Sequence, residues 1–407
     1  MTSNAPLACE EGALAERPRV LIVATHPIQY QVPWFQALAK REEIDLLVLF
    51  IQMPDPQQQG VGFGMAFKWD IPLLEGYRWQ QASGVRGRGG PAGFFAARLH
   101  RPAGMLRNLA PDVVLITGWH AWPLLQLLLA ARSRGVPVII RGESNALRKR
   151  PLPVRILHRC LMRLCMAFLT IGKSNREFYR GYGVRESSLF DAAYFVDNAR
   201  FMAAAALLAP RRDELRAAWN IPVGAVCFCF AGKLQPKKRI LDLLAALRIA
   251  QEQSTQSMHL LIVGTGEQMP QARAFVDQHR LSATFAGFLN QTEIPSAYVA
   301  ADCLVLPSDY GETWGLVVNE AMACGRPALV SDRVGCGPDL ISDGRTGALF
   351  PFGDVEALAR NLVEMAADPA QLRAMGILAR DLVSGRYSVE NAVEGTLKAV
   401  RFVRAYR

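Results

Sequence analysis

The chain has 407 residues, of which 51% are apolar and 20% charged, and its net charge is +10. This length exceeds what a single hydrophobic core usually fills, so we expect two domains, and the composition excludes a disordered or repetitive protein. Apolar stretches such as Leu124 to Ala131 are too short to span a membrane, and the eight cysteines form no CxxC pair, which favours a reducing compartment over disulfides or a metal site.

Residues 1 to 18 are expected to form a flexible tail. The segment MTSNAPLACEEGALAERP contains three glutamates and has no basic stretch that leads into an apolar one. It does not resemble a secretory signal, so we expect a cytoplasmic protein.

Residues 19 to 200 are expected to form a first doubly wound α/β domain. Short runs that are apolar at nearly every position alternate here with helix-length segments, a pattern typical of parallel strands buried on both faces. The expected strands are RVLIVAT (19–25), IDLLVLFI (44–51), DVVLIT (112–117), VPVIIRG (136–142) and AFLTIG (167–172).

Polar side chains stand at the carboxyl ends of three of these strands. They are His26, Tyr30 and Gln31 in THPIQYQVPWF (25–35), His120 in GWHAW (118–122), and Arg141, Glu143 and Asn145 in RGESN (141–145). Because the carboxyl ends of parallel strands meet at one edge of a sheet, these side chains are candidates to line a ligand site. A packed or capped histidine and a structural ion pair at the RGESN segment are the alternatives.

The basic excess of the chain lies entirely in its first half. Residues 1 to 200 hold 25 Lys and Arg against 15 Asp and Glu, while residues 201 to 407 hold 21 of each. This asymmetry suggests an anionic partner for the first domain. The sequence lacks interleaved aromatics or a known nucleic-acid module, so we expect no specific nucleic acid.

One basic segment, LPVRILHRCLMRLCMAF (152–168), places Arg155, Arg159 and Arg163 four residues apart on one face of an expected helix. Such a helix can lie on an anionic membrane, which would make the protein peripheral on its inner face. An ordinary amphipathic helix with a solvated basic face is the slightly favoured alternative.

The join between the domains is expected near residues 196–216, and residues 201 to 387 repeat the α/β alternation. The expected strands are AVCFCFAG (225–232), HLLIVGTG (259–266), TFAGF (284–288), CLVLPS (303–308) and PALVSD (327–332). Two such domains would face each other across a cleft at the carboxyl ends of their strands, the usual ligand position in open α/β sheets.

Two lysines follow the first strand of the second domain. FAGKLQPKKRILDLL (230–244) places Lys233 and Lys238 after Gly232, at the head of an expected helix. Gly232 permits close backbone approach, and two cations beside a helix N-terminus can neutralise a diphosphate.

The next strand ends in GTGEQM (264–269), which starts like a dinucleotide-binding glycine loop but has Met269 where the third glycine would stand. Gly264 therefore indicates a loop near a nucleotide rather than a nicotinamide site. Because the chain contains no Asp-x-Asp pair, nothing obvious holds a divalent metal, and the lysines would have to neutralise the phosphates.

Two glutamates stand eight positions apart in DYGETWGLVVNEAMACG (309–325). Glu312 lies in a loop, and Glu320 lies about one turn into a helix that starts near Leu316. The helix N-terminus offers backbone N–H groups to a phosphate, and the two carboxylates can accept hydrogen bonds from sugar hydroxyls. A solvated Glu and a helix-dipole Glu are the structural alternative.

At these residues the chain resembles the retaining glycosyltransferases of family 4, which have the GT-B fold of two Rossmann-like domains. The resemblance is carried by the Glu-x7-Glu element that ends at Glu320, by the Gly-Lys-x4-Lys element at Gly232, and by FLNQTEIPSAYVAADCLVLPS (288–308), which is similar to the family's base-side loop. It covers essentially all of the second half and, more loosely, the whole chain. It implies an α/β GT-B fold whose last helix (388–407) crosses back onto the first domain.

The resemblance also implies roles for single residues. Lys233, which stands where the family more often has Arg, would bind the diphosphate with Lys238; Glu320 would bind the ribose and Glu312 the transferred sugar. The donor site would comprise Gly232, Lys233, Lys238, Gly264, Phe288, Glu312, Gly315, Leu316 and Glu320. Catalysis would involve Glu312, Lys238, Lys233 and His120, the last being similar in position to a family histidine that contacts the sugar. The acceptor contacts would come from His26, Tyr30, Gln31, Arg141 and Glu143, in a domain whose first loop departs from the family's glycine-rich turn.

The sequence therefore predicts a cytoplasmic, retaining, metal-independent glycosyltransferase without a cofactor. Its donor would be a UDP- or GDP-linked sugar, and its acceptor a lipid-linked molecule or an oligosaccharide in polysaccharide or glycolipid assembly. A nucleotide-sugar epimerase with the same fold and a non-catalytic scaffold of a polysaccharide assembly complex are the alternatives.

Overall fold

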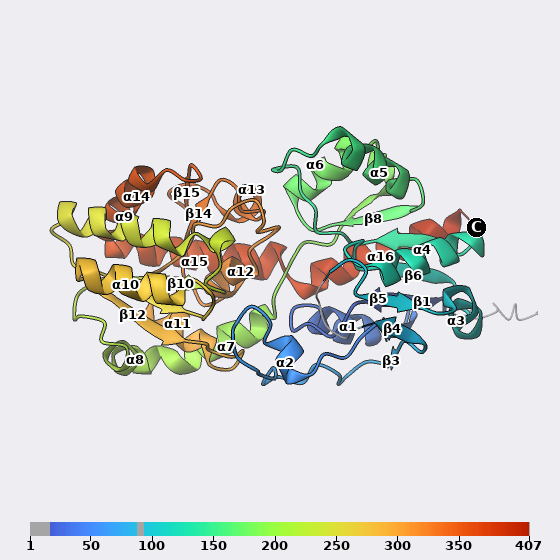
Figure 1. Ribbon diagram of the computed structural model, residues 1–407, viewed down its shortest axis with the longest axis horizontal. Helices are drawn as coiled ribbons and strands as arrows, with labels where there is room; N and C mark the ends of the chain where they lie inside the picture. Colours follow the sequence, from blue (N-terminus) through green and yellow to red (C-terminus); the bar gives the residue numbers. More distant parts are fainter. Residues whose placement is uncertain (1–16, 88–92, 407) are drawn as a thin grey trace, which may run out of the picture.

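The computed structural model describes residues 17–87 and 93–406, which form two α/β lobes lying side by side (Figure 1). Of the predicted flexible tail, residues 1–16 lie outside the described residues. Each lobe has its own parallel sheet, with helices on both faces. The chain passes from the first lobe to the second at α7 (Asn198–Leu208).

The first lobe is built on a seven-stranded parallel sheet in the order β3-β2-β1-β6-β7-β8-β9. The strands are β1 (Arg19–Ala24), β2 (Asp45–Phe50), β3 (Trp79–Gln81), β6 (Val113–Ile116), β7 (Val138–Ile140), β8 (Ala167–Thr170) and β9 (Leu189–Asp191). An antiparallel pair, β4 (Val85–Gly87) and β5 (Ala97–Leu99), forms a separate small sheet. The helices are α1 (Val32–Ala39), α2 (Pro56–Gln59), α3 (Pro102–Leu109), α4 (Trp122–Ser133), α5 (Leu152–Met162) and α6 (Lys173–Gly181).

The second lobe has a six-stranded parallel sheet in the order β12-β11-β10-β13-β14-β15. The strands are β10 (Val226–Ala231), β11 (Met258–Val263), β12 (Ala283–Gly287), β13 (Cys303–Leu306), β14 (Ala328–Ser331) and β15 (Gly347–Phe350). The helices are α8 (Arg212–Ala218), α9 (Ile240–Gln253), α10 (Met269–His279), α11 (Ile294–Ala300), α12 (Leu316–Ala323), α13 (Gly337–Leu340), α14 (Val355–Ala367) and α15 (Pro369–Arg386). The last helix, α16 (Val389–Ala405), packs against the first lobe.

Burial on both faces explains why these strands are apolar at nearly every position. All six residues of β10 are buried, and they alternate between two cores: Cys227 and Cys229 pack on one face of the sheet, Phe228 and Phe230 on the other. The strand β1 divides its side chains between two cores in the same way. The ten strands expected from the sequence are therefore present, and β3, β9 and β15 extend the sheets at their edges.

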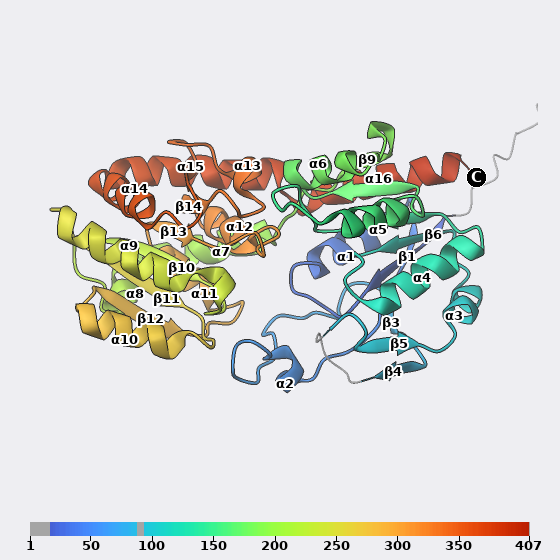
Figure 2. The ribbon, with the colours of Figure 1, turned by 45° about the horizontal axis from the view of Figure 1, so that its top comes forward.

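The last two helices connect the lobes. Figure 2 shows α15 over the second lobe and α16 continuing over the first, in line along the top of the molecule. The helix α16 begins after Ser388, whose hydroxyl accepts the Asn391 N–H at 3.3 Å. It is held by a hydrogen bond from Trp34 Nε1 to Thr396 Oγ1 of 3.2 Å, and Gly395 lies so close to the Asp191 carbonyl that a Cβ would approach it to 1.8 Å. The predicted return of the last helix to the first domain is confirmed.

No helix among the described residues combines the length and the apolar character that crossing a lipid bilayer requires.

Candidate functional site

The carboxyl ends of the two sheets face a cleft of about 420 Å³ between the lobes. Its lining comes from both sides: the loops that follow β1 and β2 in the first lobe, and those that follow β10, β11, β12 and β13 in the second. In each sheet the strand order reverses between two neighbouring strands, β1 and β6 in the first lobe and β10 and β13 in the second, and the cleft lies at the carboxyl ends of these strands. Open α/β sheets bind ligands at that position.

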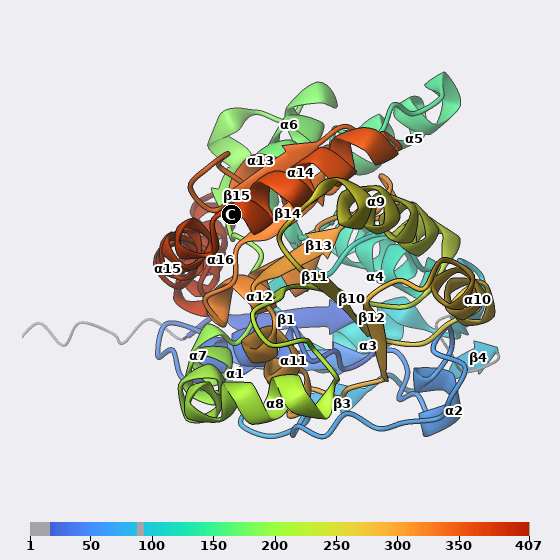
Figure 3. The same ribbon diagram turned by 90° about the vertical axis from the view of Figure 1, so that its left-hand side faces the viewer.

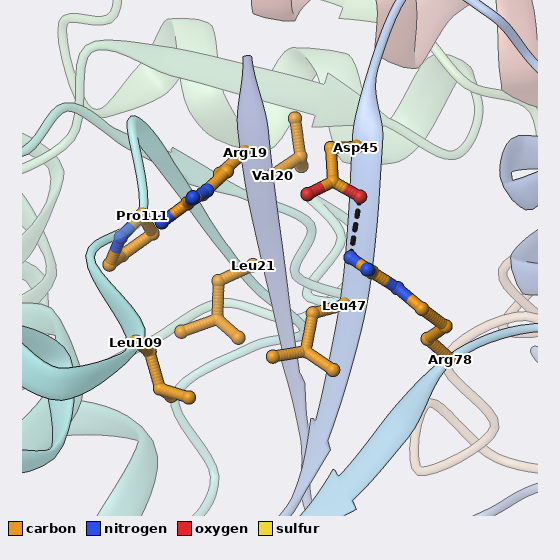
Figure 4. A pocket seen from close by; sticks show the side chains of 8 residues that line it. All are labelled: Arg19, Val20, Leu21, Asp45, Leu47, Arg78, Leu109 and Pro111. Carbon is orange, nitrogen blue, oxygen red and sulfur yellow. Dashed lines mark hydrogen bonds and ion pairs between the residues drawn. The ribbon is translucent and has the colours of Figure 1, made fainter. Parts of the chain in front are cut away.

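A smaller cavity of about 220 Å³ lies at the opposite edge of the first sheet (Figure 4). It is lined by the first residues of two strands, Arg19 in β1 and Asp45 in β2, and Asp45 forms an ion pair with Arg78 at 2.5 Å. Because ligands of such sheets bind at the carboxyl ends, we place the functional site in the larger cleft.

The second lobe's wall begins where β10 ends. Lys238 is 9% exposed and forms an ion pair with Glu312 from the loop after β13. Gly232 and Gly264 both have positive φ, +150° and +123°, and a Cβ on Gly264 would lie 2.0 Å from the Gly232 carbonyl oxygen. Because neither glycine has a Cβ, the backbone after β10 can approach the backbone after β11 closely, and the Lys238 side chain lies beside Gly232 at the cleft.

Lys233 takes a different position from Lys238. Its Nζ donates a hydrogen bond of 2.7 Å to the Val61 carbonyl of the first lobe and lies 4.4 Å from the centre of the Phe63 ring. Partial burial lowers the pKa of Lys233, and the neighbouring Lys237 and Lys238 lower it further. A bound anion would relieve this repulsion among three ammonium groups.

The loop after β13 places one carboxylate and one helix start in the cleft. Glu312 is paired with Lys238, and the side chain is 17% exposed. Gly315, at φ +99°, is the N-cap of α12, and a Cβ there would lie 2.9 Å from the Leu306 side chain. Leu316 is the first residue of the helix, whose N-terminus can bind an anion, although the Val318 N–H already donates to the Gly315 carbonyl at 2.9 Å.

Glu320, one turn into α12, is completely buried and also lines the cleft. It accepts a hydrogen bond of 2.6 Å from the Tyr298 hydroxyl. Burial raises the pKa of Glu320, while the hydroxyls of Tyr298 and of Tyr30, which reaches it from the first lobe, act in the opposite direction. A buried carboxylate that is held by hydroxyls is suited to accept hydrogen bonds from a diol.

The first lobe contributes three histidine or tyrosine side chains near the cleft. His26 and Tyr30 line it, and the pKa of His26 falls to about 4 because of burial and, to a smaller extent, because of His120. His120 lies at the turn after β6, where much of the residue is exposed. The buried part of its ring lowers its pKa, while the nearby Glu143 carboxylate raises it. His26 is therefore neutral near pH 7.

The structure does not place Gln31 and Arg141 in the cleft, contrary to our expectation. Gln31 is 7% exposed at the start of α1, and Arg141 is 2% exposed, with its guanidinium 4.6 Å from the centre of the Tyr194 ring and 5.3 Å from that of Trp34. The sequence pattern identified the end of β7 but not the face to which this side chain turns. A cation held between aromatic rings is a structural element of the first lobe.

Glu143 and Asn145 instead join the two lobes. Glu143 accepts hydrogen bonds from the Tyr194 hydroxyl at 2.5 Å and from the Thr313 hydroxyl at 3.3 Å, and Asn145 donates to the Thr313 carbonyl at 3.0 Å. Thr313 is adjacent to Glu312, so these bonds fix the loop that carries the cleft carboxylate.

A segment that the sequence analysis did not single out also lines the cleft. We call residues 56–70, GVGFGMAFKWD with the short helix α2 before it, the crossing loop; in Figure 1 it is the blue segment that reaches from the first lobe toward the second. Phe63 and Phe67 lie 5.0 and 4.6 Å from the ring of Phe288, and the Lys68 carbonyl accepts a bond of 2.7 Å from Asn290. The clustering of aromatic residues and glycines was the only signal in the sequence.

Comparison with known proteins relates the second lobe to glycosyltransferases. Residues 211–381 match the family described as Glycosyl transferases group 1. The D-inositol 3-phosphate glycosyltransferase of Streptomyces bingchenggensis is 32% identical over 180 residues, 40% of this chain and 38% of that protein. The sulfoquinovosyl transferase SQD2 of Arabidopsis thaliana is 40% identical over 104 residues, 25% of this chain and 20% of that protein. The chain thus spans less than half the length of these curated relatives.

Solved structures match the whole fold. A glycosyltransferase from Rickettsia africae superposes with a TM-score of 0.71 at 13% identity, covering 94% of this chain and 97% of that one. The Anabaena protein HepE, solved with UDP and glucose, gives a TM-score of 0.68 at 15% identity, covering 94% and 99%. The predicted GT-B fold is therefore confirmed, and the second lobe carries a group 1 glycosyltransferase domain.

Proposed function

We propose that the protein is a retaining, metal-independent glycosyltransferase that moves a sugar from a UDP- or GDP-linked donor to a hydroxyl acceptor. The observation that carries the proposal is the ion pair between Lys238 and Glu312 at the N-terminus of α12, beside the close approach of Gly232 and Gly264. It gathers a cation, a helix start and a sugar-binding carboxylate at one point of the cleft. The group 1 domain match and the whole-fold likeness support it.

The second lobe would hold the donor. Lys238, Lys233 and the N–H groups at the start of α12 would neutralise the diphosphate, and this stabilisation grows as the sugar–phosphate bond breaks. Glu320 would accept hydrogen bonds from the ribose hydroxyls, while Glu312 would orient the transferred sugar. Phe288 and the backbone at Gly264 would lie beside the base.

The acceptor would approach from the first lobe. We expect its hydroxyl to attack the anomeric carbon on the face that the diphosphate leaves, with a donor phosphate oxygen taking the proton, so that the configuration is retained. His120 would contact the sugar, and His26, which is neutral, would accept or donate a hydrogen bond without adding charge. The acceptor would be a lipid-linked molecule or an oligosaccharide used in polysaccharide or glycolipid assembly.

Metal independence is part of the proposal because two lysines and the start of α12 would neutralise the phosphates, while the two carboxylates of the cleft, Glu312 and Glu320, would bind the sugar and the ribose. The proposal is therefore tested in the presence of EDTA.

The test is a thermal-shift screen against UDP, GDP, ADP and their sugar conjugates with EDTA present, repeated on Lys238→Ala. Stabilisation by one diphosphate that disappears in the variant would support the donor site. Release of the nucleotide diphosphate only when an acceptor is added would distinguish a transferase from an epimerase. If no nucleotide stabilises the protein, the proposal fails and the scaffold alternative replaces it.

A further inference from the structure

The helix α5 exposes an apolar surface that the fold leaves uncovered. Its inner side is held by His158, Leu161 and Met162, and the His158 ring packs between Trp119 and Phe178 at 5.6 Å from each. Its outer side carries four large apolar side chains with high exposure: Leu152 (65%), Val154 (37%), Ile156 (57%) and Leu157 (66%). Single exposed apolar side chains are common on protein surfaces, but four of them within the eleven residues of α5 indicate an interaction surface.

The same helix carries unpaired positive charge along one edge of this apolar surface. Arg155, Arg159 and Arg163 recur every four residues and are exposed, and they follow the exposed Arg148 and Lys149. Among the ion pairs found in residues 17–87 and 93–406, none involves these three arginines. From Ala146 to Met166 the sequence contains no Asp or Glu.

The neighbouring helix shows that this charge is not a general property of the lobe. On α6, Arg176 and Arg180 are both paired with Glu186, and Arg176 also with Asp191 at 2.7 Å. Their charge is neutralised within the protein. The charge of α5 has no such partner, so it is available to an external anion.

We infer that α5 is a docking surface for an anionic lipid bilayer, on which it lies parallel to the membrane plane. A helix with an apolar outer side and flanking arginines inserts its apolar residues among the acyl chains while its cations meet lipid phosphates. The surface, defined by Leu152, Ile156 and Leu157 with Arg155, Arg159 and Arg163, stands clear of the other helices. Figure 3 shows α5 projecting at the upper right edge of the molecule.

This placement also relates the membrane to the cleft. The segment just before α5, which starts at Leu152, contacts the loop that carries Glu312. Asn145 donates a hydrogen bond to the Thr313 carbonyl, and the Arg148 guanidinium lies 5.1 Å from the ring centre of Tyr310. A docked α5 therefore holds the cleft next to the bilayer. If the proposed function holds, this orientation favours a lipid-linked acceptor over a soluble oligosaccharide.

The test measures binding of the full chain to vesicles. Cys160 is exposed on α5, and with Cys9 replaced by serine it can carry an environment-sensitive fluorophore. We expect a blue shift and co-sedimentation with vesicles of phosphatidylcholine and phosphatidylglycerol, neither with phosphatidylcholine alone, and loss of binding at high salt. The double variant Ile156→Gln/Leu157→Gln and the triple variant Arg155→Gln/Arg159→Gln/Arg163→Gln should each bind at least about tenfold more weakly.

A matched control removes equally exposed apolar residues elsewhere. Ile377 (53%) and Leu378 (42%) lie on α15 of the charge-balanced second lobe, and Ile377→Gln/Leu378→Gln should bind vesicles as the parent does. Equal loss in this control, binding to phosphatidylcholine alone, or binding to nucleic acid but not to vesicles would overturn the inference. Vesicle binding needs no nucleotide, so its failure and a failure of the donor screen are separate results.

Discussion

On the second lobe, the cleft wall consists of strand ends, a helix start and the short loop that carries Glu312, whereas the first lobe contributes loop residues that reach across the gap. Lys238, Glu312 and Glu320 are almost enclosed by their own lobe, and two glycines fix the backbone between them. Tyr30 and the crossing loop instead contact the opposite wall, at Glu320 and at Phe288.

This difference separates two tasks. A rigid wall with preorganised charge is suited to bind the part of a ligand that does not vary, the diphosphate and the ribose. A wall made of loops can change its contacts with little effect on the fold, so it is suited to select the variable parts, the base and the acceptor. The predictions below test this division, from the largest expected effect to the smallest.

Loss of either member of the buried ion pair should have the largest effect. Lys238→Ala and Glu312→Ala should each lower kcat/KM by about 100- to 1,000-fold, because charge stabilisation of a leaving group in an enclosed site is of that size. Steady-state kinetics with the identified donor would measure this. Lys237→Ala is the comparison: Lys237 lines the same cleft but is exposed, so water screens its charge and the loss should be much smaller. If the variants unfold, seen as loss of the thermal transition, both residues have a structural role instead of a catalytic one.

The rigidity of the second wall can be tested at Gly264. An alanine there would meet the Gly232 carbonyl at 2.0 Å in a backbone with φ +123°, so Gly264→Ala should lower the free energy of unfolding by about 3 kcal/mol or more. Gly353→Ala separates the cost of the close contact from the cost of the positive φ. Its φ is +80° but nothing lies within 4 Å of the added Cβ, so only about 1 kcal/mol is expected. Equal losses in urea unfolding would show that the close approach of β10 and β11 is not required.

The crossing loop should affect binding more than folding. Phe63→Ala removes the ring that contacts Phe288 and Lys233, and we expect about tenfold weaker nucleotide binding with little change in stability, since an aromatic pair contributes about 1 kcal/mol. Titration calorimetry with the nucleotide would measure the change. Phe94→Ala, at a partly exposed ring that does not line the cleft, is the control. Tighter binding in Phe63→Ala would mean that the loop competes with the donor, and the division of tasks would then be wrong.

The sequence was informative where burial dictates residue type. The strand β10 had to be apolar at all six positions because both of its faces are covered, and the glycines and charged residues after it followed a motif with fixed spacing. The edge strand β3 is Trp-Gln-Gln with every residue exposed, so no pattern distinguished it from a loop. Hydrophobic periodicity therefore cannot identify exposed edge strands of this kind.

Of the first wall, His26 and Tyr30 were predicted to line the cleft and do so, but the crossing loop was not predicted. The contact of Thr265 with the Phe63 carbonyl joins residues 202 positions apart, and nothing in the local sequence of the crossing loop indicates its partner. At Arg141 the strand end was predicted, but the choice between cleft and core depended on aromatic rings from two separate segments, Trp34 from one and Tyr194 and Phe195 from the other. Contacts of this kind are set by the packing of whole elements and not by spacing along the chain.

The smallest expected effect concerns pH, and it compares one histidine from each lobe. His259 is 3% exposed between Ser282 and Thr284, with hydroxyl contacts at 2.9 and 3.1 Å, and burial, followed by the charge of Arg216, lowers its pKa to about 4. His26 at the cleft has a pKa of about 4 as well, also chiefly through burial. Between pH 6.5 and 4 the unfolded chain binds a proton at each position and the folded protein does not. The free energy of unfolding should therefore fall as the pH drops, by about 1.4 kcal/mol per histidine at about pH 5.5.

Urea unfolding at neutral pH and at about pH 5.5 measures this loss, and His259→Gln and His26→Gln should each reduce it by about 1 kcal/mol. The titration of carboxylates contributes equally to parent and variants, so it cancels from the comparison. The second lobe should show the full reduction at His259, because its ring is buried and both ring nitrogens contact hydroxyls, those of Ser282 and Thr284. A much smaller reduction at His26 would mean that the loops of the first wall open in solution and let water reach the ring. In that case the two walls differ not only in how they are built but also in how firmly they are closed.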